Sequence, residues 1–337
     1  MTEEVLDELL SRPTPGVLKT FESVRGDVVV LGAGGKMGPS LSRMTRRALD
    51  ALGRPLRVIA VSRFTSGDAA ARLASAGAEV IQCDLTDRDS VARLPHADNV
   101  IFMAGQKFGT NEEPSITWAV NTLAPAIAAE RYKKSRIVAF STGNVYPFTP
   151  VARGGSQEGD ELGPVGEYAG SCAARERMLE YHARRFGTPM VFVRLNYANA
   201  LRYGVLTDIA VKVLRGVPVD VAMGYVNVIW QGDANARALQ CLARTAVPPS
   251  MVNVTGPEIV SVRAMAARFG ELLGRLPKFA GTEAEDALLS NTELSEKLFG
   301  PPVVSLDQMI EWTAEWVRDG GALLGKPTHF ETRDGVF

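Results

Sequence analysis

The stretch VVVLGAGGKMG, from Val28 to Gly38, joins a short apolar run to a loop with glycines at positions 32, 35 and 38. An apolar run of this length, followed at once by glycine, predicts a strand that is buried on both faces. Residues 36–52 then carry a helical pattern that Gly53 closes. Strand, glycine loop and helix in this order are typical of a βαβ unit that binds a dinucleotide, either NAD or NADP.

Each of the three glycines has a physical reason. Gly32 permits a tight turn, Gly35 leaves the backbone open to a pyrophosphate, and Gly38 lets the helix pack close to the strand. Lys36 and Met37 are expected at the amino end of the helix, where unpaired N–H groups and the positive end of the helix dipole attract phosphate. The alternative is a glycine-rich turn in an α/β protein that binds no ligand.

Apolar runs and helical patterns continue to alternate along the chain. We expect strands at 28–31, 57–61, 79–82, 99–103, 136–140 and 190–194, and helices at 36–52, 69–76, 117–132 and 167–186. Continuous apolar strands separated by helices indicate a parallel sheet covered on both faces, and right-handed crossovers wind it in two directions. The expected fold class is α/β: a doubly wound parallel Rossmann sheet with helices on both faces and a smaller C-terminal substrate lobe.

Four segments follow from this pattern. Residues 1–25 are an N-terminal helical extension, with one helix at 3–11 that Pro13 and Pro15 end. Residues 26–195 are the dinucleotide-binding domain, and 196–320 are a substrate lobe interleaved with the sheet. Residues 321–337 form a tail without a clear period, which wraps the protein or mediates contacts. Helices in the lobe are expected at 206–214, 231–244, 262–273 and 306–318.

Composition limits the class of protein. The 337 residues are 46% hydrophobic and carry a net charge of -1, so no basic surplus points to nucleic acid or to an anionic membrane. No stretch approaches the roughly 20 apolar residues of a membrane helix. The three cysteines lie far apart and the three histidines are scattered, which argues against disulfides and a structural metal site. We expect a cytoplasmic protein without a membrane or nucleic-acid partner.

The end of the second strand selects between the two dinucleotides. An NAD site places a carboxylate there, about 20 residues beyond the glycine loop, to bind the ribose hydroxyls. This chain has Ser62 and Arg63 instead, and arginine can bind a 2′-phosphate. NADP is therefore expected, with NAD as the alternative, and Arg63 could also be a solvated loop residue. Asp84, at the end of the third strand, is expected to accept a hydrogen bond from the adenine amino group.

Several further sequence blocks along the chain together carry a resemblance to one family. They are the glycine spacing, CDLTD at 83–87, FMAG at 102–105, Asn121, FSTGNVY at 140–146 and VNVTGPE at 252–258. Together they resemble the extended short-chain dehydrogenase/reductases, also called the NAD-dependent epimerase/dehydratase family, over residues 26–318. In that family the last block belongs to the carboxy-terminal lobe.

The resemblance implies roles for individual residues. Thr142 would supply the active-site hydroxyl and Tyr168 would act as the acid/base. The implied cofactor-binding residues, besides those of the glycine loop and the ribose position, are Leu85, Ala104, Gly105, Gln106, Asn121, Tyr168, Leu195 and Asn196.

The family's catalytic pair is a tyrosine and, one helical turn later, a lysine that lowers the tyrosine pKa from about 10 and holds the nicotinamide ribose. Here the sequence is YAGSC, from Tyr168 to Cys172, so the lysine is missing. A cation could come from the oxidised nicotinamide or from another side chain. The candidates are Lys107, Arg153, Arg202 and Arg175, the last ranked below the loop residues because two helical turns, roughly 10 Å, separate it from the tyrosine.

Three interpretations of Cys172 remain open. The protein binds cofactor without catalysis, or it is an enzyme in which another group replaces the lysine, or the cysteine itself acts as a nucleophile or acid. A small helix residue packed beside the ribose fits the first two.

The substrate side departs from the family as well. Gly143 and Asn144 follow Thr142 where dehydratases have an acidic pair, which weakens a dehydratase assignment. The stretch RLNYAN at 194–199 lacks the family's usual Gly-Pro, which favours a smaller sugar or sugar acid over a sugar nucleotide. Polar candidates for the pocket, each alternatively a surface loop residue, are Asn144, Tyr146, Asn196, Tyr197, Arg202 and Tyr203.

The expected function is that of an NAD(P)-dependent oxidoreductase or epimerase acting on a hydroxyl or keto group of a sugar or sugar-acid-like substrate. The alternative is a catalytically degenerate dinucleotide-binding sensor or regulatory protein. A homodimer through the tyrosine-bearing helix and its neighbour at 117–132 is expected from the resemblance.

Overall fold

Seven parallel strands form the central sheet, in the order β12-β7-β5-β4-β1-β2-β3. The computed structural model describes residues 1–65, 68–107, 109 and 112–336. The strands are β1 (Val28–Leu31), β2 (Val58–Ser62), β3 (Glu79–Gln82), β4 (Asn99–Phe102), β5 (Arg136–Thr142), β7 (Met190–Leu195) and β12 (Ser250–Val254). The strand order reverses next to β1, so the prediction of a doubly wound α/β fold is confirmed.

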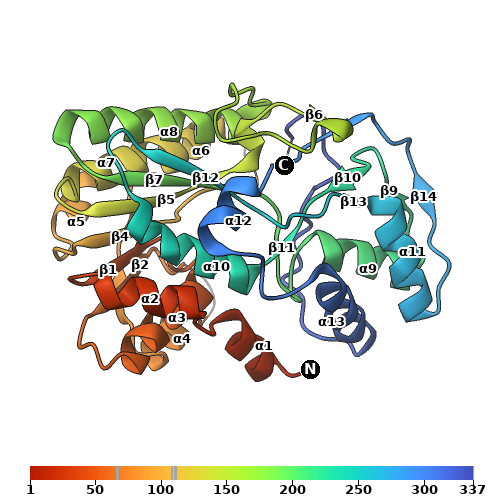
Figure 1. Cartoon of the computed structure of the whole chain (residues 1–337), viewed down its shortest axis with the longest axis horizontal. Helices are drawn as coiled ribbons and strands as arrows, with labels where there is room; N and C mark the ends of the chain where they lie inside the picture. Colours follow the sequence, from red (N-terminus) through yellow and green to blue (C-terminus); the bar gives the residue numbers. More distant parts are fainter. Residues whose placement is uncertain (66–67, 108, 110–111, 337) are drawn as a thin grey trace.

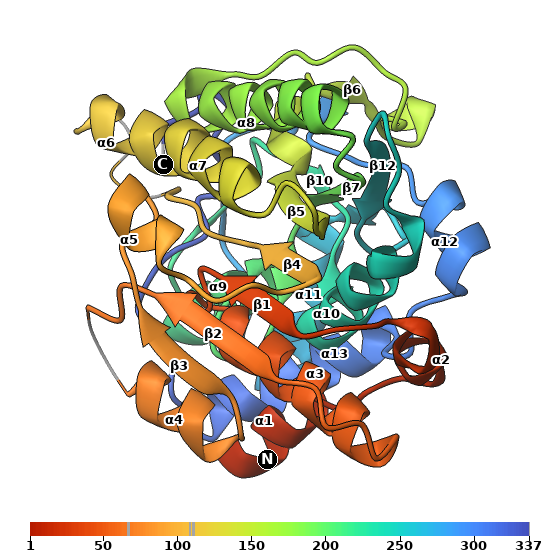
Figure 2. The ribbon, with the colours of Figure 1, turned by 90° about the vertical axis from the view of Figure 1, so that its left-hand side faces the viewer.

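Helices cover both faces of this sheet (Figures 1 and 2). In β1, Val28 and Val30 pack toward one face while Val29 and Leu31 pack toward the other, the period of two that a strand imposes. One face carries α2 (Pro15–Ser23), α3 (Gly38–Ala51), α4 (Ala69–Ser75) and α10 (Gln231–Gln240). The other carries α5 (Arg88–Ala92), α6 (Pro114–Trp118), α7 (Ala124–Arg131) and α8 (Gly166–Phe186).

The seventh strand, β12, was not expected. The block at 252–258 was assigned to the substrate lobe, but its first residues pair with β7 along the whole of β12. This apolar run is short and lies between two helical patterns, so its period did not separate a sheet strand from a lobe segment. The lobe segment therefore contributes one strand to the central sheet.

The expected helix at 117–132 is broken into three parts. Between α6 and α7 lies a π-helical turn, Ala119–Leu123. Pro125 has no N–H to donate to the carbonyl of Asn121, which is four residues earlier. The Arg175 side chain donates to that carbonyl instead, with its Nε 3.0 Å from the oxygen. The break is therefore a consequence of Pro125, and a side chain of α8 satisfies the carbonyl that Pro125 leaves without a donor.

The N-terminal extension contains two helices rather than one. Helix α1 (Glu3–Leu10) ends as expected, but Pro15 begins α2 instead of only terminating α1. Proline suits the first position of a helix because its missing N–H has no partner there, and the Thr14 hydroxyl caps α2 by accepting from Val17 N. Both prolines thus mark a boundary between helices.

The lobe has its own core, formed by α9 (Val205–Arg215), α11 (Val262–Leu273) and α13 (Leu306–Arg318). The helix expected at 231–244 continues beyond α10 only as a 3-10 turn, Cys241–Arg244, and α12 (Glu293–Phe299) was not expected. Short strand pairs complete the lobe: β6 (Thr149–Pro150) with β15 (Asp286–Ala287), β8 (Ala198–Asn199) with β11 (Ile229–Trp230), β9 (Val219–Asp220) with β14 (Phe279–Ala280), and β10 (Tyr225–Val226) with β13 (Val260–Ser261).

Helix α1 bridges the sheet domain and the lobe. Glu8 forms an ion pair with Arg47 of α3, at 2.9 Å. Asp7 forms one with Arg202 of the lobe, at 2.6 Å, and Leu6 lies in the lobe core. The extension therefore fixes the position of the lobe against α3.

The tail after α13 wraps back over the lobe without forming a helix or strand. Leu324 N donates to the Arg202 carbonyl, and Thr328 N donates to an Asp208 carboxylate oxygen at 2.7 Å. Arg333 pairs with Asp286. The tail was expected either to wrap the protein or to mediate contacts, and in the structure it wraps the lobe. In the part of the chain that the structure describes, no helix is both long and apolar enough to cross a membrane.

Candidate functional site

Two adjoining cavities open at the carboxyl ends of the central strands, where the strand order reverses. The larger has a volume of about 990 Å³ and lies between the sheet and the lobe. The smaller, of about 240 Å³, lies over the ends of β2 and β3. Their common wall contains Gly32, Gly34, Gly35, Met103 and Gly105. This is the crevice in which doubly wound sheets bind ligands.

The glycines of the loop serve two purposes: some permit close packing, and one leaves the backbone open to the cavities. Gly32 has φ +92°, and a Cβ there would lie 2.5 Å from the backbone N of Ala104. A Cβ at Gly38 would lie 2.2 Å from the Ala33 carbonyl oxygen, so this glycine serves close packing and does not line either cavity. At Gly35 the only atom near a Cβ would be the Gly32 oxygen, at 3.4 Å. The backbone at Gly35 is thus open toward both cavities.

Helix α3 begins at Gly38, two residues later than expected. Its N-cap residue, Met37, makes no side-chain hydrogen bond to the first turn. The first N–H groups of the helix are therefore not satisfied by a side-chain cap, and Gly35, Lys36 and Met37 all line the larger cavity. These features fit an anionic group at the start of α3.

The smaller cavity gathers the residues expected around the adenosine. Ser62, Arg63, Asp84, Leu85 and Ala104 all line it. One Asp84 oxygen accepts hydrogen bonds from Thr86 N and Oγ1, which lower the pKa of the carboxyl. The Arg63 side chain is exposed at the cavity rim.

The far wall of the larger cavity carries the candidate chemistry. Tyr168 of α8 and Thr142 at the end of β5 both line it, and the two hydroxyls lie within hydrogen-bonding reach. Burial raises the pKa of Tyr168 well above its ordinary value, and the neighbouring Cys172 raises it further, while Arg175 lowers it. The phenol is therefore protonated in the protein alone. The expected residues Leu195, Asn196, Asn144, Tyr197 and Arg202 line the same cavity.

Besides Gly38 and Cys172, three expected site residues line neither cavity. Gln106 and Asn121 do not line the larger cavity; Asn121 Oδ1 accepts from Gln106 N at 2.8 Å, so this pair holds the loop after β4 in place. Tyr146 is only 2% exposed, because its hydroxyl accepts from Arg194 and donates to Asn253 in the core. The substrate role predicted for Tyr146 is not supported by this geometry.

A buried ion pair explains why Tyr146 is drawn into the core. Arg194 of β7 and Glu176 of α8 form a two-bonded pair, at 2.7 and 3.0 Å, with side chains 3% and 4% exposed. Ser141 of β5 donates to the same Glu176 carboxylate at 2.5 Å. This cluster fixes α8 against β5 and β7, and so fixes the positions of Tyr168 and Thr142.

A model of the NAD-dependent epimerase/dehydratase family matches residues 28–204, just over half of the chain. The chain belongs to this family. No curated protein sequence matches the chain. Solved structures similar to it include a UDP-glucose 4-epimerase from Thermotoga maritima with UDP-glucose (19% identity, TM-score 0.70) and a UDP-glucuronic acid 4-epimerase from Bacillus cereus with NAD (17%, TM-score 0.72).

A dTDP-glucose 4,6-dehydratase from Streptomyces venezuelae with NAD is also similar, at 18% identity and a TM-score of 0.73. Each of the three alignments covers 87% of this chain, and 97–99% of the other chain. At these identities the likeness shows the fold alone, while the family assignment rests on the match over residues 28–204.

Cys172 stands where the resemblance places a lysine, and its chemistry is different. Its side chain is fully buried and does not line either cavity. Burial raises the pKa of the thiol, so Cys172 is a neutral thiol beneath Tyr168. A direct nucleophilic role is therefore not supported by the geometry, and the cysteine packs as a small apolar residue.

Two of the four candidate cations influence the residues Tyr168 and Cys172 electrostatically. Arg175 lowers the pKa of both Tyr168 and Cys172, although two helical turns separate it from the tyrosine. Long helical side chains lean toward the helix amino end, which brings the guanidinium closer than the backbone spacing suggests. Lys107 lines the larger cavity and also lowers the pKa of the Cys172 thiol. Arg175, ranked below the loop residues from its spacing, is thus the one of the four candidates that lowers the pKa of Tyr168.

The other two cations are held by carboxylates. Arg153 pairs with Asp160 at 2.8 Å and lies outside the larger cavity. Arg202 lines that cavity but is paired with Asp7 and Glu3 of α1. Neither is placed to act on Tyr168.

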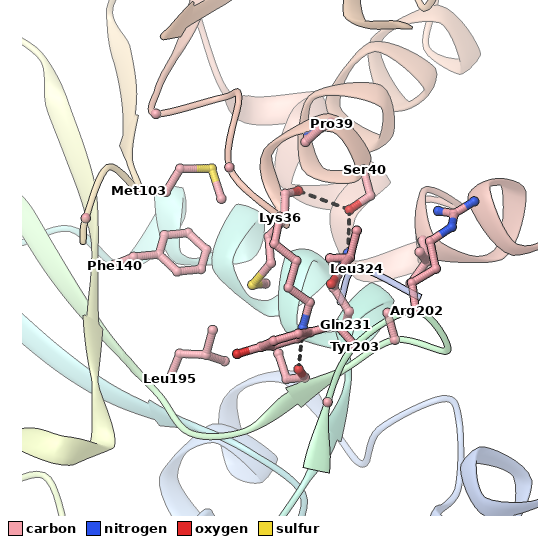
Figure 3. Close-up of a pocket in the computed structure, with 18 of the residues that line it drawn as sticks. Lys36, Pro39, Ser40, Met103, Phe140, Leu195, Arg202, Tyr203, Gln231 and Leu324 are labelled. Atoms are coloured by element: carbon pink, nitrogen blue, oxygen red, sulfur yellow. Dashed lines mark hydrogen bonds between the residues drawn. The ribbon is translucent and has the colours of Figure 1, made fainter. Parts of the chain in front are cut away.

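Sequence reasoning missed cavity residues that come from distant segments. They are Asp7 and Leu10 of α1, Arg43 of α3, Arg72 of α4, Phe140 of β5, Gln231 of α10, and Leu324, Lys326 and Thr328 of the tail. Figure 3 shows several of them around one space. The tail carries no periodic pattern, and no local signal relates Thr328 to Asp208, so the sequence offered no means to place it.

Lys36 leaves the glycine loop toward the lobe. Its ammonium donates to the Ala198 carbonyl at 2.7 Å and lies 4.3 Å from the ring centroid of Tyr203 (Figure 3). Burial lowers the pKa of Lys36 to about 7, and the nearby Lys107 lowers it further while Asp208 opposes the shift.

We expect Lys36→Met to raise the melting temperature of the ligand-free protein at pH 7. The Lys36 pKa is about 7 in the folded protein and about 10.4 in an unfolded chain. Between these values the unfolded chain binds the proton more strongly, so wild-type stability rises with pH across this window and the cost is greatest below it. The pKa difference alone corresponds to about 4 kcal/mol near pH 7. The lost bond to Ala198 and the lost contact with the Tyr203 ring offset part of it, and the net gain should fade by about pH 10.

Differential scanning calorimetry at several pH values measures this gain. Lys134→Met, which removes an exposed lysine outside both cavities, is the control and should show no such pH dependence. A lower melting temperature for Lys36→Met at pH 7 would contradict a burial cost.

Proposed function

We propose that the chain is an NADP-dependent oxidoreductase or epimerase that acts on a hydroxyl or keto group of a small sugar or sugar acid. The observation that carries this proposal is that Tyr168 and Thr142 line the same cavity as the open glycine loop. Tyr168 is the acid/base and Thr142 hydrogen-bonds the reacting oxygen. The family membership adds support, since the similar structures are epimerases and a dehydratase.

The residues present fit a dinucleotide. The open backbone at Gly35 and the uncapped start of α3 suit a pyrophosphate, and the smaller cavity, lined by Ser62, Arg63 and Asp84, suits an adenosine. When bound, a nicotinamide dinucleotide supplies hydride exchange and, in its oxidised form, a positive charge. The chain must then supply binding, orientation and proton transfer.

Proton transfer is assigned to the Tyr168 hydroxyl. Thr142 would hold the substrate oxygen beside it, and the phenol would take the hydroxyl proton during oxidation or return it during reduction. Arg175 acts in place of the family's lysine as a cation that favours the phenolate, and Lys107 lines the same cavity. Arg175 also holds Asn121 and Phe140, so its position is fixed.

One observation favours the sensor alternative. The phenol pKa is raised by burial and by Cys172, so proton abstraction at neutral pH would need more positive charge than Arg175 supplies in the protein alone. A protein that binds the dinucleotide without turnover would fit this. Measurements of turnover and of dinucleotide binding separate the two functions.

Tyr168→Phe should abolish turnover while leaving dinucleotide binding intact, because it removes only the proton-transfer hydroxyl. A loss of at least about 100-fold in kcat is expected from removing a general acid/base. Turnover is followed by nicotinamide absorbance across a panel of neutral sugars, sugar acids and polyols with NADP and NAD.

Tyr225→Phe, in β10 and outside both cavities, is the control and should keep full activity. Unchanged turnover in Tyr168→Phe would contradict the acid/base assignment. Tight dinucleotide binding without any turnover of the wild-type protein would support the sensor.

Arg63→Ala tests the choice of NADP. Loss of a charge-assisted contact to the 2′-phosphate should weaken NADP binding by about 10- to 100-fold and leave NAD binding unchanged. Isothermal titration calorimetry with both dinucleotides measures this. Arg57→Ala at the other end of β2 is the control, since Arg57 pairs with Asp27 far from the cavity. Equal affinity of both variants for NADP would contradict the assignment and favour NAD.

The substrate is proposed to be smaller than a sugar nucleotide. Asn144 lies where an acidic pair would serve dehydration, and the tail residues Leu324, Lys326 and Thr328 line the lobe side of the cavity. The tail therefore takes up space in the same cavity as Tyr168, which favours a small substrate. The similar epimerase with UDP-glucose is a fold match only.

We also propose a homodimer through α6, the π turn and α8. Figure 2 shows α6, α7 and α8 along one side of the molecule. Their outer surface exposes large apolar side chains: Ile116, Trp118, Leu123, Met178 and Tyr181. A patch of this kind favours association. Light scattering after size-exclusion chromatography should give twice the chain mass of 36.3 kDa. A mass of a single chain would exclude a stable dimer.

A further inference from the structure

The Lys36 ammonium sits in the cavity wall without an ion-pair partner among the residues that the structure describes. Its contacts are the Ala198 carbonyl and the face of the Tyr203 ring, both of which are neutral. The closest acid that acts on it, Asp208, accepts two hydrogen bonds from Thr328 at 2.7 and 2.6 Å. An ammonium has three donors, so Lys36 retains donor capacity toward the cavity.

The Tyr203 phenol lies beside this ammonium, and a second phenol, Tyr197, lies near Tyr203. Both tyrosines line the cavity, and Tyr203 is close enough to raise the pKa of Tyr197. Within the described part of the chain, neither hydroxyl forms a hydrogen bond. Burial raises the pKa of both phenols above the ordinary value, so both are neutral donors.

The backbone at Tyr197 is held in an unfavourable conformation. Its φ is +45°, in the left-handed region that a residue with a large side chain rarely adopts. The Tyr197 carbonyl accepts from Asn199 Nδ2 at 2.6 Å and from Ile229 N, and these bonds hold the strained turn. Strain of this kind is concentrated where a side chain must point into a site.

We propose that Lys36, Tyr197 and Tyr203 form a subsite for an anionic oxygen group, a carboxylate or a phosphate, carried by the carbohydrate substrate. The subsite rests on the proposed function, since it names the substrate class of the same cavity. One ammonium and two phenol hydroxyls provide charge-assisted and neutral hydrogen bonds to such a group. The group would also supply the counter-charge that Lys36 lacks.

The charges of the cavity wall agree with an anionic substrate. The wall contains six cationic side chains, namely Lys36, Arg43, Arg72, Lys107, Arg202 and Lys326. Among the described wall residues the only carboxylate is Asp7, which is paired with Arg202. The whole chain carries a net charge of -1, so the positive charge is a property of this cavity.

The dinucleotide does not account for the position of the Lys36 ammonium. A pyrophosphate at the start of α3 would be bound by backbone N–H groups of the loop. The Lys36 side chain instead crosses to the lobe wall, where it meets Ala198 and Tyr203. Asn144, Thr142 and Tyr168 line the same cavity, so a substrate oriented by Lys36 has its other end near the acid/base.

The test uses the full chain saturated with NADP and three probes: D-glucuronate, D-glucose 1-phosphate and neutral D-glucose. Isothermal titration calorimetry should show one of the two anionic probes binding more tightly than glucose. Lys36→Met should weaken that probe by about 10- to 100-fold, the usual worth of a charge-assisted bond. Tyr203→Phe should cause a smaller loss, and Lys134→Met none. The better anionic probe tells a carboxylate site from a phosphate site.

Other results would overturn the subsite. Equal affinity for all three probes, no binding of any probe, or an unchanged anion affinity in Lys36→Met would each do so. A large loss of NADP affinity in Lys36→Met with unchanged probe binding would assign the lysine to the pyrophosphate.

The outcome is separable from that of the proposed function. Turnover of a neutral sugar that depends on Tyr168, without preference for an anionic probe, would refute the subsite alone. Anion binding that depends on Lys36, with turnover unaffected by Tyr168→Phe, would refute the acid/base assignment alone.

Discussion

The guanidinium of Arg175 connects the segments on which the candidate site depends. Its Nε, Nη1 and Nη2 atoms donate to the Asn121 carbonyl, the Phe140 carbonyl and the Asn121 side chain, respectively. These bonds join α8, which carries Tyr168, to the end of β5, which carries Thr142, and to the π turn that Pro125 causes. Asn121 in turn holds Gln106 and the loop after β4. One buried cation thus satisfies a broken helix, sets the distance between two hydroxyls, and contributes positive charge near the phenol.

The regular part of the fold could be predicted because its signals are local. Continuous apolar runs and their glycine loop gave β1, β2, β3, β4, β5 and β7 and the covering helices within a few residues. The strand β12 could not be separated from the lobe by its period, and α2 was missed because Pro15 can end one helix or begin another. In the site, residues tied to a motif, such as Thr142, Tyr168 and Asn196, do line the cavity. Tyr146 carried the same kind of motif but was drawn away by a buried ion pair that only tertiary structure reveals.

Segments outside the family's matched region help to form the cavity. The matched region spans residues 28–204, yet Asp7 of α1 and Thr328 of the tail lie in the cavity wall. The extension holds the lobe through Arg202, and the tail holds α9 through Asp208. The extension and the tail therefore contribute to the shape of the cavity, together with residues inside the matched region. Contributions of this kind are how one fold can keep a cofactor and change its substrate.

The strand order has a consequence for how the protein is made. Strand β1 lies inside the sheet. On one side of it, β4, β5, β7 and β12 follow outward in the same order as in the chain. A ribosome releases the chain from its amino end, so the glycine loop and its neighbours can assemble while the rest is still being synthesised. The cavity wall, in contrast, closes only when Lys326 and Thr328 have emerged. A nascent chain would therefore acquire its nucleotide-binding half well before it acquires selectivity for a substrate.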